Sequence, residues 1–89
     1  MQIWKFILEV RDEIRVSMPV GAHILTVQTQ GNSPCIWAIC NPTAEREWRH
    51  FRIYGTGHDM LNNPGTYVGT FQLHGGRAVF HLFDIGAKP

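Results

Sequence analysis

The stretch from Trp48 to His58 restricts the fold most, because its residues alternate in character and then reach a glycine-containing turn. Alternate side chains of a β-strand point to opposite faces. Phe51 and Ile53 therefore share one face, which suits a core. The other face is aromatic and cationic and carries Trp48, His50, Arg52 and Tyr54. The pattern predicts a strand that ends near Tyr54 and leads into a turn.

Short segments of the same kind recur along the chain. Apolar and β-branched residues are enriched in them, and Gly, Pro and Asn separate them. These segments are 2–10, 14–18, 22–30, 35–40, 66–74 and 77–85. No stretch of ten or more residues has a helical period. We therefore predict a mainly β fold, a compact antiparallel sandwich or barrel-like roll of about seven short strands with little helix.

The apolar positions predict how the strands pair. We expect 2–10 and 14–18 to form a hairpin, because a three-residue connection sets apolar residues opposite one another. If Gln30 pairs with Cys35 and Asn41 with Arg46, the next three strands align, and Gln28, Trp37 and His50 lie side by side. One face of that sheet is then a core of Leu25, Val27, Ile36, Ala38, Phe51 and Ile53.

The last hairpin turns at Gly75-Gly76, a dipeptide that can take the positive φ angles of a tight turn. Thr70 should then oppose His81, and Gln72 should oppose Val79. A second core layer should consist of Tyr67, Phe71, Leu73, Ala78, Phe80 and Leu82.

Composition limits the classes of function. The 89 residues suffice for one domain, 1–89, and a chain this short often gains stability by forming a homo-oligomer. Eight Lys and Arg against seven Asp and Glu disfavour general nucleic-acid binding. No apolar run approaches the roughly 20 residues of a membrane span, and the start of the chain lacks a signal-peptide pattern. We expect a cytoplasmic protein without membrane contacts.

Reactive residues give little support to catalysis. Cys35 and Cys40 leave opposite faces of one strand, so we expect free thiols. A nucleophilic Cys35 near His50 or Arg52 is one enzymatic possibility, and a role for His58 is another. The five histidines show no metal-ligand spacing. We predict no catalytic residue, metal or cofactor, and favour a binding protein over an enzyme.

The aromatic face is the main functional signal. Trp37, Trp48 and Tyr54 can stack on a base, Arg52 can neutralise a phosphate, and glutamine amides can read base or ribose edges. The turn Tyr54–His58 offers backbone N–H groups at its glycines as an anion nest. An exposed face of this kind is equally typical of a subunit or protein interface. Both interpretations stay open.

Three stretches carry a resemblance to a known family: YGTGH (54–58), PGTYVGTFQLHGGRAVFHLF (64–83) and MPVGAHILTVQTQGNSPCIWA (18–38). Through them the chain resembles a widespread family of small phage and prophage proteins that carry a domain of unknown function. The resemblance implies a phage context, with variation expected over 41–49, and no mechanism.

In that context we expect an oligomeric sponge that sequesters a small nucleotide-like immune signal. Its expected ligand-binding residues are Gln28, Trp37, Arg52, Tyr54, Gly55, Thr56, Gly57, His58, His74 and Arg77. The alternatives are a protein-interaction or structural phage component that uses the aromatic face, and a small enzyme that uses Cys35 or His58.

Overall fold

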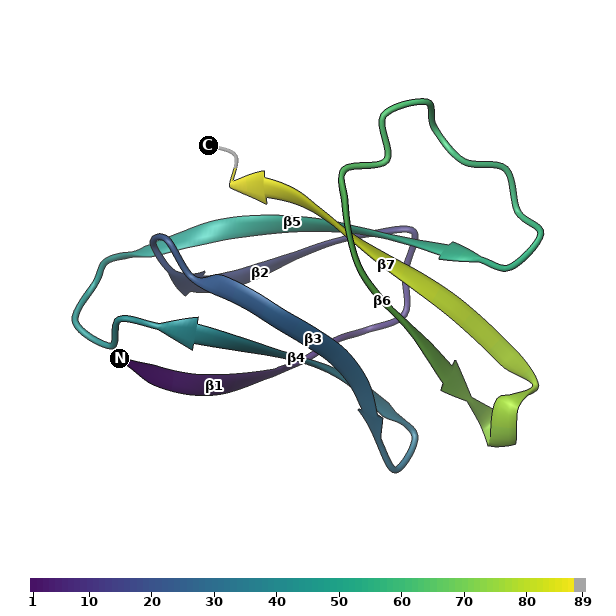
Figure 1. Cartoon of the computed structure of the whole chain (residues 1–89), viewed down its shortest axis with the longest axis horizontal. Coiled ribbons are helices and arrows are strands. Elements are labelled where there is room, and N and C mark those ends of the chain that lie inside the picture. The colour runs from purple at the N-terminus through teal and green to yellow at the C-terminus, as the bar shows by residue number, and fades with distance from the viewer. Residues whose placement is uncertain (88–89) are drawn as a thin grey trace.

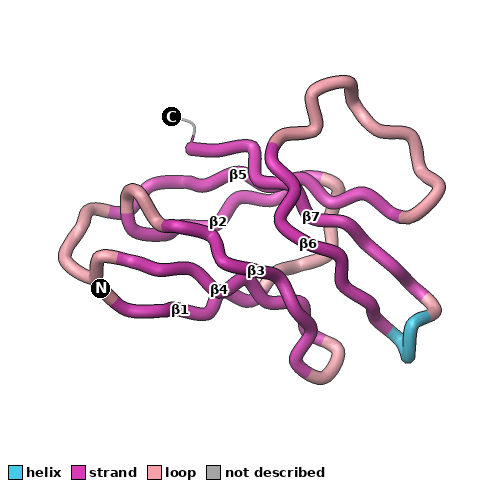
Figure 2. Tube along the Cα trace, in the orientation of Figure 1, coloured by secondary structure: helices cyan, strands magenta, loops and turns pink. Residues whose placement is uncertain are grey.

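The computed structural model describes residues 1–87, which form seven strands and one short 3₁₀ turn (Figure 1). These elements are β1 (Gln2–Ile7), β2 (Glu13–Pro19), β3 (His23–Gln30), β4 (Ser33–Cys40), β5 (Arg46–Gly55), β6 (Thr66–Leu73), η1 (His74–Gly76) and β7 (Ala78–Ala87). One antiparallel sheet has the order β1-β4-β3 and the other has the order β2-β5-β7-β6. Strands dominate the trace (Figure 2), so the predicted mainly β fold is confirmed as a two-sheet sandwich.

The chain changes sheet between β1 and β2, between β2 and β3, and between β4 and β5. The expected hairpin of 2–10 with 14–18 is therefore wrong: β1 pairs with β4, and β2 pairs with β5. The expected pairing of Asn41 with Arg46 is wrong for the same reason. The three-residue connection of the expected hairpin would set Leu8 opposite Val16, but both instead contribute to the core between the sheets. Two apolar residues can contact each other across facing sheets as well as between paired strands, so the apolar pattern alone did not distinguish the two arrangements.

The core lies between the two sheets and receives side chains from both of them. Its buried members are Leu8, Met18, Ala22, Val27, Ile36, Ala38, Cys40, Phe51, Ile53, Phe71, Leu73 and Leu82. Most residues of the two expected core layers are among them. The sheets approach each other closely where β3 meets β6, since a Cβ on Gly69 would lie 3.0 Å from Val27 Cγ1. A Cβ at position 69 would therefore force the Val27 side chain to shift.

Two residues of the expected core layers, Leu25 and Tyr67, are instead exposed. The β3–β4 register shifts between Ile24 and Thr26, and the β6–β7 register shifts between Tyr67 and Gly69. A β-bulge inserts one extra residue and so reverses the alternation on one side of it. The expected burial of Leu25 and Tyr67 is wrong because each adjoins such a shift.

The two predicted hairpin registers had different outcomes. In the last hairpin, Thr70 pairs with His81 and Gln72 pairs with Val79, as predicted. Gly75 and Gly76 both have positive φ, at 67° and 89°. In the β3–β4 hairpin, however, Cys35 pairs with Gln28 and not with Gln30, because the chain turns more tightly at 31–32. Residues 33 and 34, which lie outside the expected strand 35–40, belong to β4.

A bidentate ion pair holds one end of the sandwich. Arg49 Nε and Nη2 donate to the two carboxylate oxygens of Asp84 at 3.1 and 2.8 Å, and Nη1 donates to the Ala22 carbonyl at 2.9 Å. The backbone N–H of Gly86 donates to Asp84 Oδ1 at 2.8 Å. The pair therefore ties β5 and β7 to the turn before β3. Within residues 1–87, no helix is long and apolar enough to cross a membrane.

Candidate functional site

The outer face of β2 and β5 brings together a guanidinium, an indole and an imidazole. The Arg15 guanidinium carbon lies 4.1 Å from the centroid of the exposed Trp48 ring, and Arg15 pairs with His50 across the ladder. We call Arg15, Trp48 and His50 the Arg15 platform. Arg15 forms no ion pair with any other residue in the described range 1–87. Its charge is therefore free to meet an anion, and the indole holds the guanidinium in place.

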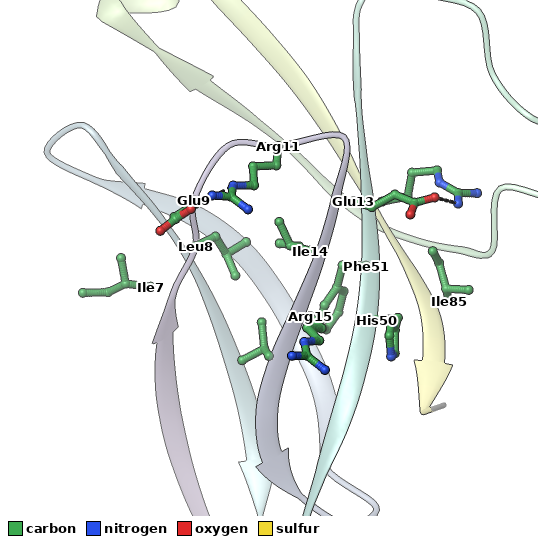
Figure 3. A pocket seen from close by; sticks show the side chains of 12 residues that line it. Ile7, Leu8, Glu9, Arg11, Glu13, Ile14, Arg15, His50, Phe51 and Ile85 are labelled. Atoms are coloured by element: carbon green, nitrogen blue, oxygen red, sulfur yellow. Dashed lines mark hydrogen bonds and ion pairs between the residues drawn. The ribbon is translucent and has the colours of Figure 1, made fainter. Parts of the chain in front are cut away.

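A pocket of about 660 Å³ adjoins the platform and includes Arg15 and His50 in its lining (Figure 3). Its volume lies in the range of ordinary small-molecule sites. Ion pairs already satisfy two of its other cations: Arg11 bonds to Glu9 at 3.0 Å, and Arg52 bonds to Glu13. Its apolar lining residues include Ile7 and Ile14, whereas Phe51 borders the pocket without any exposed surface. The pocket thus combines an unpaired guanidinium with apolar surface.

Arg52, the expected phosphate ligand, lies on the outer face of β5 as predicted. Its guanidinium is hydrogen-bonded to the Glu13 carboxylate on the neighbouring strand. That hydrogen bond raises the pKa of Arg52, against an opposing effect of burial, so the side chain stays cationic. Because Glu13 neutralises this charge locally, Arg52 is a weaker phosphate ligand than its position predicted.

The turn Tyr54–His58 lies at the end of β5 and borders a second pocket of about 640 Å³. Tyr54, expected on an open face, is buried because the following loop covers it and Leu61 N donates to its hydroxyl at 3.4 Å. Three carboxylates line this pocket, those of Asp12, Glu13 and Asp59. Arg52 also lines the pocket and is paired with Glu13, so Asp12 and Asp59 leave a negative charge that opposes the binding of an anion here.

The backbone of this turn is also largely occupied. Thr56 N donates to the Val79 carbonyl at 3.2 Å, and His58 N donates to the Gly55 carbonyl at 3.1 Å. Gly57 has the left-handed φ of 86° that the chain reversal requires. Thr56 and His58 therefore have no free N–H group for an anion, and only the N–H groups of the glycines are left to form the expected nest.

Sequence reasoning predicted the pair of Thr70 and His81 on β6 and β7 but missed the aromatic rings that lie beside it. The Phe83 ring lies between Tyr54 and Tyr67, with centroid distances of 5.7 and 5.5 Å. His81 is hydrogen-bonded through Nε2 to the Thr56 hydroxyl at 2.7 Å and through Nδ1 to the Thr70 hydroxyl at 2.9 Å. The alternation of 77–85 was a signal for this shared face. The rings continue the aromatic surface beyond Tyr54.

The remaining expected site residues lie elsewhere. Gln28 and Trp37 belong to β3 and β4 in the other sheet, where Trp37 pairs with Thr26 and Lys5. They therefore do not join His50, and the expectation that Gln28, Trp37 and His50 lie side by side is wrong. His74 is bound at the turn of the last hairpin, where its N–H donates to Asn32 Oδ1 at 3.0 Å. Arg77 lies at the same exposed turn.

Arg15 itself was not among the expected site residues. The alternation of 13–18 indicates that Arg15 and Ser17 share the face opposite Ile14 and Val16. The expected hairpin with 2–10, however, placed this strand beside the wrong neighbour. Only the pairing of β2 with β5 brings Arg15 onto Trp48.

The proposed nucleophile Cys35 does not meet a base. It is 1% exposed, its thiol hydrogen-bonds to the Ser33 carbonyl, and it lies in the sheet that excludes His50 and Arg52. The expected proximity of Cys35 to His50 or Arg52 is wrong because β4 and β5 do not pair. Both cysteines are free and buried, as predicted for unpaired thiols. Within residues 1–87, no group of three or more His, Cys, Asp or Glu side chains could hold a metal ion.

Comparison with known proteins gives one match. A family model described as "Domain of unknown function (DUF7352)" matches residues 1–88. Neither the curated proteins nor the solved structures contain a match to the chain. Since the family model covers nearly every residue, the chain belongs to the family of proteins with this domain of unknown function.

Proposed function

We propose that this protein is a non-enzymatic binding protein for a small ligand that carries both a ring and an anionic group, as a nucleotide does. The Arg15 platform receives the ligand. The ligand ring stacks on the face of the Trp48 indole that Arg15 leaves open, while Arg15 and His50 contact the phosphate. The adjoining pocket of about 660 Å³ has room for the rest of a nucleotide-sized molecule.

The observation that carries this proposal is the placement of Arg15 over Trp48 at 4.1 Å without a carboxylate partner in residues 1–87. A guanidinium in a fixed plane donates two parallel hydrogen bonds to a phosphate. Stacking of a base on an aromatic side chain contributes about 1–3 kcal/mol. Arg11, Arg49 and Arg52 each have a carboxylate partner and lack this freedom.

The biological setting of the proposal comes from the resemblance to phage proteins. In an infected bacterial cytoplasm, such a protein acts as a sponge that sequesters a nucleotide-derived immune signal. Sequestration requires binding without a chemical reaction. This agrees with Cys35, which is buried and whose thiol bonds to a backbone carbonyl in place of a general base.

Isothermal titration calorimetry tests the proposal with cyclic dinucleotides, ADP-ribose derivatives and mononucleotides. We expect at least one of them to bind, and we expect Trp48→Leu to weaken that binding by about 5- to 150-fold, the equivalent of about 1–3 kcal/mol. Trp37→Leu, in the other sheet, is the matched control and should leave the affinity unchanged. Failure of the whole panel to bind would reject the proposal.

A protein-interaction role is the second candidate, and the outer face of the β1-β4-β3 sheet favours it. The exposed side chain of Leu25 lies on β3, and the half-buried side chains of Trp37 and Ile39 lie on β4. Exposed apolar groups of this kind are typical of protein interfaces. Pull-down from infected cells distinguishes the two functions, because a small-molecule sponge should recover no stoichiometric partner protein.

A further inference from the structure

The two sheets end in four edge strands: β1 and β3 in one sheet, β2 and β6 in the other. An edge strand presents unpaired backbone N–H and C=O groups to which another strand can bind. Proteins usually block such edges with charged side chains, proline, bulges or covering segments. An edge strand that is not blocked is therefore the place where a further strand can pair with the sheet.

Three of the four edges are blocked. On β2, the strand ends at Pro19, and Arg46 Nη2 donates to the Ser17 carbonyl at 2.7 Å. On β3 and β6, a register shift interrupts each strand. These two strands also contact each other, with Thr29 Oγ1 donating to the Gln72 carbonyl at 3.0 Å.

The fourth edge, β1, lacks the proline, register shift and covering segment of the others in residues 1–87. The Arg46 guanidinium carbon lies 5.6 Å from the centroid of the Trp4 ring, but Arg46 donates its hydrogen bonds to Ser17 on β2. Residues Gln2–Ile7 pair with β4 without a register shift, and the strand contains no proline. Within residues 1–87, no backbone hydrogen bond involves its free side. β1 lies along the outer border of the molecule (Figure 1). Ile3 and Ile7, on its outer face, are 62% and 67% exposed.

Lys5 is the one charged residue of β1, and its side chain does not block the addition of another strand at this edge. Its ammonium donates to Gln30 Oε1 at 2.8 Å. Gln30 lies on β3, at the opposite side of the sheet from the free edge of β1. The Lys5 side chain therefore extends over the sheet and away from the strand's open side.

The sequence of β1 is close to self-complementary about Lys5. In the segment Ile-Trp-Lys-Phe-Ile (3–7), an antiparallel copy centred on Lys5 sets Ile3 opposite Ile7, and Trp4 opposite Phe6. Apolar and aromatic cross-strand pairs of this kind stabilise sheets. Two copies related by a two-fold axis must present surfaces that complement themselves. Binding of an unrelated strand has no such requirement, so the self-complementary sequence favours a second copy of this chain as the partner.

We propose that two copies of this chain pair antiparallel through β1, with the two-fold axis at Lys5, to form one continuous six-stranded sheet. Each Ile3 packs against Ile7 of the second copy, and the two ammonium groups point away from the axis toward Gln30 of their own subunits. A contact of one short strand per subunit is small, so we expect a dissociation constant on the order of 10 μM. This assembly is independent of the proposed ligand site, which lies on the other sheet.

Sedimentation velocity of the full chain tests the dimer from about 1 to about 500 μM, on either side of the expected dissociation constant. Wild type should shift from monomer to dimer across this range. Ile3→Lys and Ile7→Lys alter exposed side chains, so both variants should fold, and each should weaken dimerisation at least tenfold. Leu25→Lys changes the outer face of the same sheet on β3, at the opposite side from β1, and should leave dimerisation intact.

Two outcomes of this experiment would overturn the proposal. One is a wild type that stays monomeric throughout the range. The other is a dimer that Leu25→Lys abolishes while Ile3→Lys does not, since that result would place the contact on the sheet face.

Cysteine cross-linking tests the register directly. Residues opposite each other in an antiparallel pair have Cα atoms about 4.5–5.5 Å apart, within the reach of a disulfide. Oxidation of Lys5→Cys with diamide should therefore give a covalent dimer, whereas the two copies of Ile3→Cys should be about 14 Å apart and should not link. The native Cys35 and Cys40 are buried and do not compete. Equal rates of linking for the two variants would refute the register.

Discussion

Replacement of Asp84 by Asn should lower the free energy of unfolding by about 3 kcal/mol. The change keeps the shape of the side chain and removes its charge. Arg49 and Asp84 are 16% and 13% exposed, and two hydrogen bonds join their charged groups. Loss of one partner of a buried pair costs about 3–5 kcal/mol because the other charge stays desolvated. The residual exposure of this pair places the expected cost at the lower end.

The matched control is Glu9→Gln, which removes the same kind of charge from a surface pair. Glu9 and Arg11 are 76% and 70% exposed, so that change should cost about 0–1 kcal/mol. Urea unfolding followed by tryptophan fluorescence measures both costs, with an unchanged dependence on urea concentration. For a domain of this size, the Asp84→Asn effect corresponds to a fall in Tm of about 12–24 °C.

A double-mutant cycle with Arg49→Met assigns the effect to the pair. Since the two side chains contact each other, the double variant should be more stable than the sum of the single effects predicts, by at least about 1 kcal/mol. If Asp84→Asn cost no more than Glu9→Gln, the reasoning from burial would be refuted.

Three further changes have expected outcomes. Gly65→Ala should lower the free energy of unfolding by several kcal/mol, because Gly65 has φ of 97° and a new Cβ would lie 2.5 Å from the Asp84 carbonyl oxygen. Gly57 has φ of 86° but open space around it, so Gly57→Ala should lower it by only about 1–2 kcal/mol. Chemical denaturation compares the two variants. Burial raises the pKa of the Cys40 thiol above its ordinary value of 9.0, so the folded state keeps this proton to higher pH than the unfolded state, and the free energy of unfolding should fall as pH rises above about 9. Cys40→Ala should remove that part of the decline when unfolding is measured between pH 7 and about pH 10. Leu82→Ala, at a position with no exposed surface, should cost about 2–5 kcal/mol in the same assay, and a cost below 1 kcal/mol would mean that the core repacks there.

Local sequence signals were sufficient for the last hairpin. Two glycines with positive φ determine where the chain reverses, and the pairing of Thr70 with His81 follows by counting back from that turn. The partner strand is adjacent in sequence, so no choice between distant strands arises. Strand content and most core residues followed from alternation in the same way.

The sheet assignment could not be obtained from alternation. An apolar strand face is equally satisfied by a neighbour in its own sheet or by the facing sheet, so β1 fitted β2 as well as its true partner β4. The candidate site depended on that choice. Trp48, His50 and Arg52 share one strand and therefore lie together, as predicted. Trp37 lies in the other sheet, and Arg15 joins the site because β2 pairs with β5.

Native mass spectrometry of the protein, isolated without denaturation from the cells that produce it, tests the central claim most directly. We predict that wild type retains a phosphate-containing compound, that Arg15→Gln loses it, and that Trp37→Leu keeps it. Wild-type protein that carries no small molecule, or an Arg15→Gln variant that carries the same one, would contradict the assignment of the ligand to Arg15, Trp48 and His50.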